Sequence, residues 1–206
     1  MKTVIRVSSI LLAIILLLIC GTWLFLKYTN WGFSTPLPVA ETALRSHVVI
    51  SAQNWLGTQE GDENHSRILE IYNSHTPLAQ GYLVTDTDNW CATFASAIAI
   101  DCNLTDIIPT ECGCQRQITL WQELGRWEEN DNYMPNPGDY IYYAWDESFS
   151  FGDCTGWADH VGIVVGIAGP FIKVIEGNRK DAVTYRIILR GDWQIRGYGL
   201  PDYSAK

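Results

Sequence analysis

The feature that most constrains this chain is an uncharged, mostly apolar run over residues 7–26, VSSILLAIILLLICGTWLFL. A helix of this length spans about 30 Å, the thickness of the hydrocarbon core of a membrane. Lys2 and Arg6 precede the run, and Trp23 and Tyr28 lie at its far end, where interfacial aromatics are typical. We therefore expect an uncleaved transmembrane anchor whose basic end stays in the cytoplasm.

A cleaved signal peptide is the alternative interpretation of this run. A signal peptide has a shorter apolar region that ends in a site of small residues. Here the run ends in Trp23, Leu24 and Phe25, and Cys20 follows Ile19 rather than the small residue of a lipidation site. The sequence favours the anchor.

Charge divides the chain at the same place. The formal net charge is −9, from 14 Lys and Arg against 23 Asp and Glu, but the first 30 residues carry +3 and the remainder −12. Proteins bind phosphate backbones through Lys and Arg, so this acidic body argues against nucleic-acid binding. We expect a cytoplasmic N-terminus, an anchor, a proline-containing linker and a single extracytoplasmic domain, over residues 1–6, 7–27, 28–42 and 43–206.

The hydrophobic pattern of residues 43–206 changes from helical to strand-like about half-way along this domain. Apolar residues at helical spacing predict helices over residues 44–56, 64–74, 91–100 and 117–127. Short β-rich runs separated by Gly, Asp and Pro predict strands within residues 135–145, 160–168, 171–178, 182–189 and 193–201. Helices followed by an antiparallel sheet predict an α+β fold in which the N-terminal helices pack on the sheet.

Cysteines supply the first candidate for chemistry. Of six, Cys20 lies in the apolar run, so the body holds an odd number and one thiol is expected to stay free. Cys91 is the best candidate, because N-cap residue types precede it and a helix N-terminus favours the thiolate. The alternative is a small buried core residue. The other four permit two disulfides, with Cys102 paired to Cys112 or Cys114 as the first choice.

His160 begins a predicted strand and could face a cysteine carried by a helix, which is the Cys–His arrangement of papain-like hydrolases. Glu176 lies in an apolar run where a solvated carboxylate is not expected. Either Glu176 or Asn178 could accept the second imidazole N–H and fix the tautomer of His160. The alternative for residues 176–178 is an ordinary turn.

Four motifs in one order resemble the CHAP family, the cysteine, histidine-dependent amidohydrolases/peptidases related to NlpC-type wall hydrolases. They are DNWCATF, PGDYIYY, DHVGIV and IEGN, at residues 88–94, 137–143, 159–164 and 175–178. The resemblance spans roughly residues 48–203. The helical segment that precedes the four motifs is similar to that of family members from prophages and mobile elements of Gram-positive bacteria. It implies a papain-like fold in which Cys91 is the nucleophile, His160 the base, Glu176 the group that orients it, and Asn178 a nearby polar residue.

The resemblance implies a membrane-anchored peptidoglycan hydrolase, either an amidase or an endopeptidase. The alternatives are an acyl-transferring transpeptidase and a non-catalytic wall-binding or assembly component of a phage or conjugation apparatus. We expect no cofactor and no metal, since His47, His65 and His75 form no ligand cluster and fit surface positions. Trp90, Trp145 and Trp157 are candidates for contact with substrate.

Overall fold

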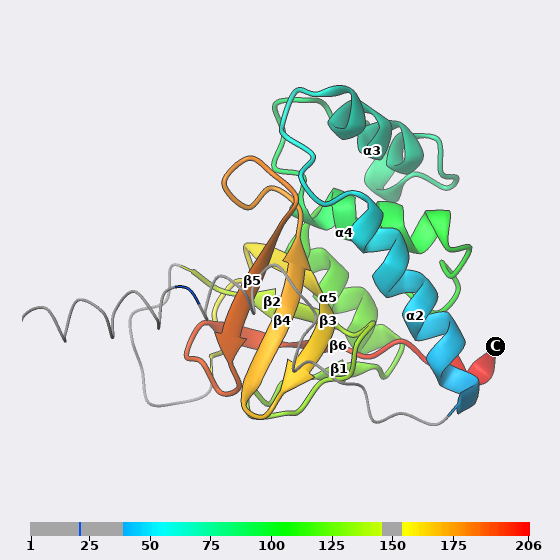
Figure 1. The fold of residues 1–206 in the computed structure, drawn as a ribbon. Helices are drawn as coiled ribbons and strands as arrows, with labels where there is room; N and C mark the ends of the chain where they lie inside the picture. The colour runs from blue at the N-terminus through cyan, green and yellow to red at the C-terminus, as the bar shows by residue number, and fades with distance from the viewer. Residues whose placement is uncertain (1–20, 22–38, 146–153) are drawn as a thin grey trace, which may run out of the picture.

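The computed structural model describes residues 21, 39–145 and 154–206, and these form the expected α+β fold (Figure 1). The helices are α2 (Val39–Asn54), α3 (Glu63–Asn73), α4 (Cys91–Asp101) and α5 (Cys114–Glu123), with short 3₁₀ turns η1 (Ala79–Gly81) and η2 (Tyr203–Ala205). The strands are β1 (Trp127–Glu128), β2 (Tyr140–Tyr143), β3 (His160–Ala168), β4 (Phe171–Glu176), β5 (Thr184–Leu189) and β6 (Ile195–Gly199).

The expected anchor over residues 7–27 lies outside the described residues, apart from Gly21, which is helical. Within the described ranges, no helix is long and apolar enough to cross a membrane. The expected linker over residues 28–42 is described only from Val39, where α2 begins.

A side-chain cap begins α3 but not α4. The Asp62 side chain caps α3 by accepting a hydrogen bond of 2.7 Å from the His65 backbone N–H. Helix α4 begins at Cys91 as predicted, but its N-cap is Trp90, which makes no side-chain cap. Asp88 instead accepts a hydrogen bond of 2.8 Å from the Thr85 backbone N–H.

Helix α5 begins three residues earlier than predicted and ends at Glu123. Trp127, which was expected to end this helix, lies in the short edge strand β1, which pairs with β6. Gly125, with φ of 65°, lies between the two elements and ends the helix with a left-handed residue.

The sheet has the order β1-β6-β2-β3-β4-β5, and every pair of neighbours is antiparallel. The turn at Gly169 joins β3 to β4 as predicted, with Ala168 paired to Phe171. Because Tyr143 pairs with His160 and Glu176 pairs with Thr184, the end of β2, the start of β3, the end of β4 and the start of β5 meet at one edge of the sheet.

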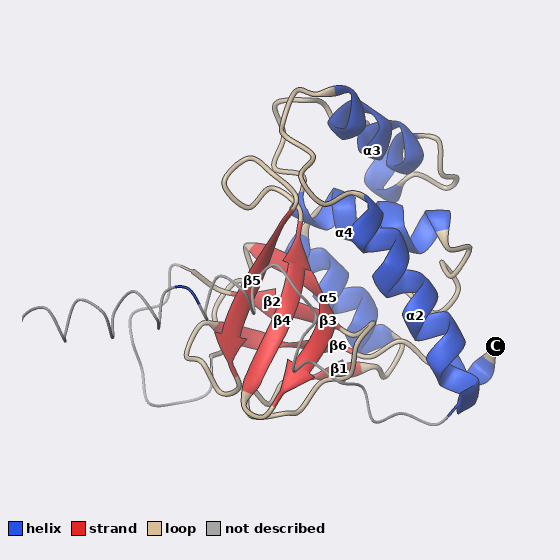
Figure 2. Ribbon diagram, viewed as in Figure 1, coloured by secondary structure: helices blue, strands red, loops and turns tan. Residues whose placement is uncertain are grey.

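The helices gather on one side of the sheet (Figure 2). The core between them includes fully buried Trp90, Phe94 and Trp121 from the helical half and Ile163 and Ile175 from the strands. Helix α4 packs on β3 and β4 with nine of its eleven residues buried, which explains its small, apolar sequence. This packing brings the start of α4 against the sheet.

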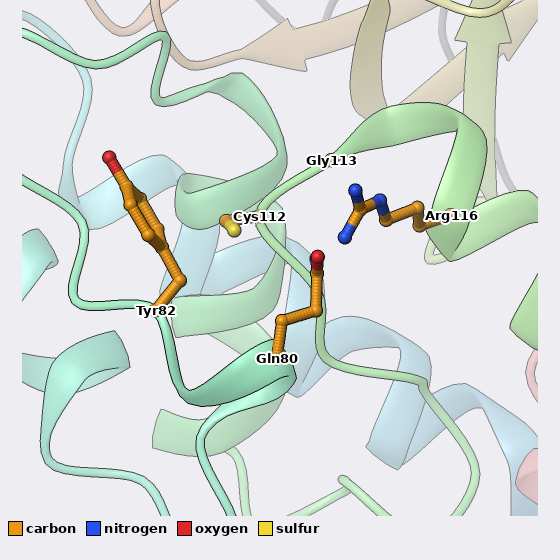
Figure 3. Close-up of a pocket in the computed structure, with 5 residues that line it drawn as sticks. All are labelled: Gln80, Tyr82, Cys112, Gly113 and Arg116. Atoms are coloured by element: carbon orange, nitrogen blue, oxygen red, sulfur yellow. The ribbon is translucent and has the colours of Figure 1, made fainter.

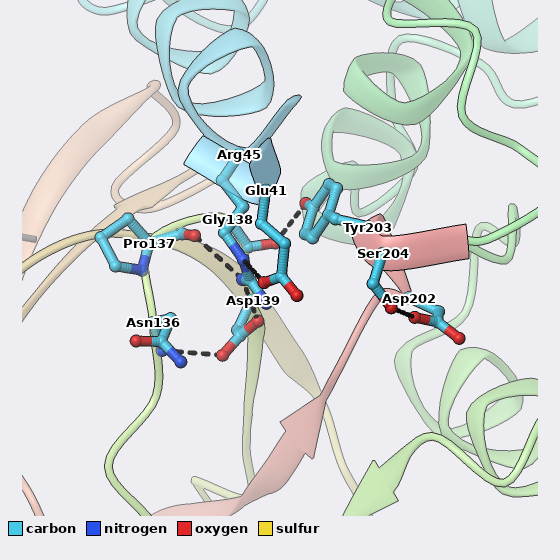
Figure 4. A network of polar contacts seen from close by, with 9 residues as sticks. All are labelled: Glu41, Arg45, Asn136, Pro137, Gly138, Asp139, Asp202, Tyr203 and Ser204. Atoms are coloured by element: carbon cyan, nitrogen blue, oxygen red, sulfur yellow. Dashed lines mark hydrogen bonds and ion pairs between the residues drawn. The ribbon is translucent and has the colours of Figure 1, made fainter. Parts of the chain in front are cut away.

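A buried polar network ties α2 to the start of β2 (Figure 4). Arg45 donates to a carboxylate oxygen of Asp139 at 2.7 Å and to the Pro137 carbonyl oxygen at 3.1 Å. Its guanidinium also lies over the ring of Tyr203, whose hydroxyl donates to the Gly138 carbonyl oxygen at 2.7 Å. The network therefore joins the first helix, the sheet and the C-terminal turn.

The expectation that His65 lies at the surface is wrong. His65 is fully buried rather than exposed, with its ring against Trp90 and its Nδ1 accepting a hydrogen bond from the Gly61 backbone N–H. Trp90 is also fully buried and donates from Nε1 to Glu60 at 3.0 Å. The two side chains therefore pack together where α3 meets the start of α4.

Candidate active site

Cys91 is the first residue of α4 and its thiol is unpaired. Its side chain is buried, with Sγ 3.9 Å from the Asp159 carbonyl oxygen. The first turn of a helix has backbone N–H groups without intrahelical partners, and the Ala92 N–H lies within hydrogen-bonding reach of the sulfur. The N-terminus of α4 thus favours a negative charge on Cys91.

His160 lies beside this thiol at the start of β3, within hydrogen-bonding reach of Cys91. Its Nε2 atom lies 3.3 Å from Oε2 of Glu176, the last residue of β4. Because Glu176 holds Nε2, Nδ1 is the ring nitrogen left for Cys91. The structure therefore brings Cys91, His160 and Glu176 together at the shared edge of the sheet.

Glu176 is fully buried but has two cationic partners besides His160. Arg186 on β5 donates to Oε1 at 2.5 Å, and Arg179 lies 3.4 Å from Oε2. Burial raises the pKa of Glu176, but His160 and Arg186 outweigh it and hold the pKa below its usual range. The carboxylate is therefore ionised and fixed.

The protonation of the pair follows from these contacts. The Cys114 thiol lowers the pKa of Cys91 and burial raises it, while His160 lowers it further, so the pKa falls well below its ordinary value. Burial lowers the pKa of His160, but Cys91 and Glu176 together raise it to about 10. At neutral pH the site therefore holds a thiolate and an imidazolium.

The comparison with protein families decides the identity of this fold. The family model described as CHAP domain matches residues 81–178, which include Cys91, His160 and Glu176. The chain contains a CHAP domain. The resemblance expected from the sequence is thus confirmed, and CHAP domains are generally hydrolytic, acting as amidases or peptidases. No curated protein matches the chain.

Asn178, the other candidate for orienting His160, lies just beyond β4 in the CHAP domain with a left-handed φ of 54°. Its Nδ2 donates to Oδ1 of Asn89 at 3.3 Å. Asn89 precedes Cys91 by two residues, so Asn178 links the end of β4 to the segment that leads into α4. The imidazole contact itself is made by Glu176.

One of the tryptophans expected to meet substrate borders the CHAP site. Trp145 stacks on Tyr143, with ring centroids 4.8 Å apart, and lies 5.6 Å from the His160 ring. Its backbone N–H donates to the Asp159 carboxylate at 3.0 Å. Trp157 precedes His160 by three residues in the sequence and is 76% exposed.

Among the described residues, the disulfide expected between Cys102 and Cys112 or Cys114 is not formed. Cys102 lies at the C-terminal end of α4, and Cys112 contacts the Glu111 carboxylate at 3.4 Å. Cys114 was a candidate partner for Cys102, but its Sγ lies 3.6 Å from Sγ of Cys91 instead. It is the first residue of α5, and the packing of α5 beside α4 sets this contact.

A pocket of about 410 Å³ lies next to this segment of the CHAP domain (Figure 3). Its lining combines polar side chains with the backbone that leads into α5, and consists of Gln80, Tyr82, Cys112, Gly113 and Arg116. The Gln80 amide nitrogen donates to Glu111 at 2.8 Å, which leaves the Gln80 carbonyl oxygen as an acceptor. Arg116 is exposed, and the described residues include no hydrogen-bond or ion-pair partner for it.

Sequence reasoning missed three residues of this region: Arg186, Cys114 as a neighbour of the nucleophile, and Arg116. For Arg186 a signal existed, since a buried carboxylate such as Glu176 requires a cation and the next strand carries one. The positions of Cys114 and Arg116 depend on how α5 packs, and no spacing in the sequence encodes that.

Proposed function

We propose that this protein is a peptidoglycan hydrolase that cleaves an amide bond of the wall peptides with Cys91 as the nucleophile. The observation that carries the proposal is the placement of a helix-borne thiol beside an imidazole held at 3.3 Å by a buried glutamate. CHAP domains are generally amidases or peptidases, which accords with this chemistry. A wall-binding role without catalysis would require none of these three groups.

In the proposed reaction the Cys91 thiolate attacks the carbonyl carbon of the amide. Negative charge develops on the carbonyl oxygen, where backbone N–H groups in the first turn of α4 can stabilise it. The His160 imidazolium then protonates the leaving amine, and the neutral imidazole activates a water molecule that releases the acyl group from Cys91. Glu176 stays ionised and stabilises the imidazolium.

Substrate contacts follow from the surroundings of Cys91. Trp145 borders the side of His160, and the pocket at Arg116 lies on the side of Cys114. Because Gln80 and Arg116 offer an acceptor and a cationic donor, the pocket suits a polar part of a wall peptide rather than an apolar side chain.

The proposal includes a membrane anchor at residues 7–27, supported by the uncharged run in the sequence. A protease added to intact spheroplasts should degrade the domain over residues 43–206 and spare the N-terminal segment. Protection of that domain in intact spheroplasts would contradict the orientation.

The enzymatic proposal is tested by digesting purified sacculi with the reduced full-length protein and analysing the products by mass spectrometry. Release of an intact stem peptide indicates an amidase, a cut within the peptide indicates an endopeptidase, and new cross-links indicate acyl transfer. Cys91→Ala should abolish the products, with a loss of several orders of magnitude. Cys102→Ala, at the other end of α4, is the matched control. Equal product formation by Cys91→Ala and the wild type would overturn the proposal.

A further inference from the structure

Two cysteines meet at the starts of two helices in this structure. Cys91 is the first residue of α4 and Cys114 the first residue of α5, and their Sγ atoms lie 3.6 Å apart. Both side chains are buried. In the mechanism proposed above only Cys91 forms and breaks bonds, so Cys114 is a second thiol in contact with the reacting atom that takes no part in those bond changes.

The pair can form a disulfide with little movement. A disulfide needs the sulfur atoms about 2.0 Å apart, so they must approach one another by about 1.6 Å. Side-chain rotation in a helix is restricted mainly by the preceding turn, and neither cysteine has one. Because each cysteine is the first residue of its helix, its side chain is free of that restriction, and only the short approach of the two sulfur atoms is needed.

The two thiols also differ in the way that a stepwise oxidation requires. Cys91 is the sulfur beside the His160 imidazolium and the start of α4, so it carries the negative charge and reacts first with an oxidant. The neighbouring thiolate raises the pKa of Cys114, which keeps its proton. Cys114 is thus positioned to react second, on the oxidised sulfur of Cys91.

We propose that Cys114 is a resolving cysteine, which converts peroxide-oxidised Cys91 into a reversible Cys91–Cys114 disulfide and so makes the hydrolase depend on redox state. The loss of hydrolysis rests on the proposed function, whereas the disulfide itself does not. The modification site is the sulfur pair, and the oxidant is a small peroxide, which can reach a buried thiol.

The chemistry balances in two steps. The Cys91 thiolate attacks one oxygen of hydrogen peroxide, the O–O bond breaks, and the departing hydroxide takes a proton to leave as water, so that Cys91 becomes a sulfenic acid. The Cys114 sulfur then attacks the sulfur of that sulfenic acid, the S–O bond breaks, and hydroxide leaves with the proton of Cys114 as a second water. Each sulfur loses one electron, and the peroxide oxygens gain both.

The test uses the reduced full-length protein, treated with a several-fold molar excess of hydrogen peroxide, blocked with N-ethylmaleimide and digested before aspartate residues. This cleavage separates the cysteines into peptides that cover residues 88–100, 101–105 and 106–130, with Cys91 in the first and Cys114 in the third. We expect the first and third peptides to be recovered as one linked species, and fragmentation to place the link at Cys114 rather than Cys112. Dithiothreitol should separate them and restore all hydrolytic activity.

Variants distinguish the role of Cys114. In Cys114→Ala the same treatment should carry Cys91 on to sulfinic and sulfonic acids, and dithiothreitol should not restore the activity of that variant, measured against its own reduced form. Cys102→Ala, the matched control, should form the link as the wild type does. Over-oxidised Cys91 in the wild type, a link from Cys91 to another cysteine, or equal recovery of Cys114→Ala and the wild type would each overturn the proposal.

The readout also separates this proposal from the function on which its consequence rests. If reduced protein digests no sacculi while the linked peptide still forms, the proposed hydrolase is wrong and the disulfide stands. If reduced protein digests sacculi and no link to Cys114 forms, the redox proposal is wrong and the hydrolase stands.

Discussion

At the scale of single residues, Glu176 controls the candidate site because it is a fully buried carboxylate among three nitrogen-bearing partners. Its Oε2 holds the imidazole and its Oε1 is fixed by Arg186, whose guanidinium in turn lies over the Trp145 ring at 4.4 Å. The orientation of His160 therefore depends on a chain of contacts that extends to β5, outside the residues matched by the family model.

Glu176→Gln should lower kcat by about 10²- to 10⁴-fold, because the amide cannot stabilise the imidazolium as a carboxylate does. Loss of the negative charge should also lower the pKa of His160 from about 10, so the alkaline limb of the rate profile should move to lower pH. The pH dependence of kcat/KM and of Cys91 alkylation by iodoacetamide measures both effects. An unchanged alkaline limb would argue that Glu176 does not act on His160.

The Glu176 carboxylate also makes the stability of the fold depend on pH. The pKa of Glu176 is lower in the folded chain than its ordinary 4.5, so its ionisation stabilises the fold above about pH 4.5 and this contribution is lost as the pH falls further. In urea unfolding at pH 7, the free energy of unfolding of Glu176→Gln should be well below that of the wild type. This difference in free energy should shrink at pH 3.5. A difference that is constant with pH would contradict this linkage.

At the scale of elements, contacts between helices and strands rest on a few buried positions. Arg45 and Asp139 form an ion pair between α2 and β2 in which both side chains are almost completely buried. The pKa of Asp139 lies above its usual value because burial outweighs the attraction of Arg45. Such a pair costs little while complete, but a single partner leaves an uncompensated charge in the interior.

Arg45→Met should therefore destabilise the fold by roughly 3–5 kcal/mol, since it strands the Asp139 carboxylate. The double variant Arg45→Met with Asp139→Asn should lose less stability than Arg45→Met alone, because it has no buried carboxylate charge. Chemical denaturation of both variants measures the difference. Equal losses would mean that the ion pair itself, rather than the stranded carboxylate, carries the effect.

Gly177 is the second such position, between Glu176 and Asn178. A Cβ atom at this glycine would lie 2.5 Å from Cβ of Phe94 on α4, which is closer than carbon atoms can pack. Gly177→Ala should cost about 1–3 kcal/mol through overpacking and should push the end of β4 away from the start of α4. Thermal unfolding combined with the rate of Cys91 alkylation tests this, and a variant with unchanged stability and alkylation would contradict it.

Periodicity and turn residues in the sequence locate most of these elements to within a few residues. They correctly predict the first residue of α4 and the turn at Gly169, because apolar spacing and glycine determine the conformation of the residues next to them. They miss β1, whose two residues have no periodicity, and they place α5 three residues late. Cys91, His160 and Glu176 could be named because their residue types are unusual for their surroundings. The burial of His65 and Trp90 and the contact of Cys114 could not, since these result from the packing of helices far apart in the sequence.

At the scale of the whole molecule, the acidic charge shapes how substrate is bound. The chain beyond residue 30 carries −12, so an anionic wall is repelled at long range. Arg116 at the pocket is an exposed cation within this acidic body. This local positive charge therefore attracts an anionic group that the net charge of the body repels.

Arg116→Gln should raise KM for muropeptides that carry free carboxylates by several-fold and leave kcat nearly unchanged, because Arg116 lines the pocket and has no contact with Cys91, His160 or Glu176 among the described interactions. Added salt should reduce the difference between the variant and the wild type, since exposed charges are screened over about 10 Å at 0.1 M. Steady-state kinetics at two salt concentrations measures this. A fall in kcat without a change in KM would place Arg116 in the chemistry instead.

The catalytic groups come from two layers that are far apart along the chain, with the thiol on a helix and the imidazole and carboxylate on the sheet. A chain whose helices have formed but have not docked on β3 and β4 has a cysteine without a base. The candidate site is therefore complete only when the helices dock on the sheet, so any activity of Cys91 depends on tertiary packing rather than on either layer alone.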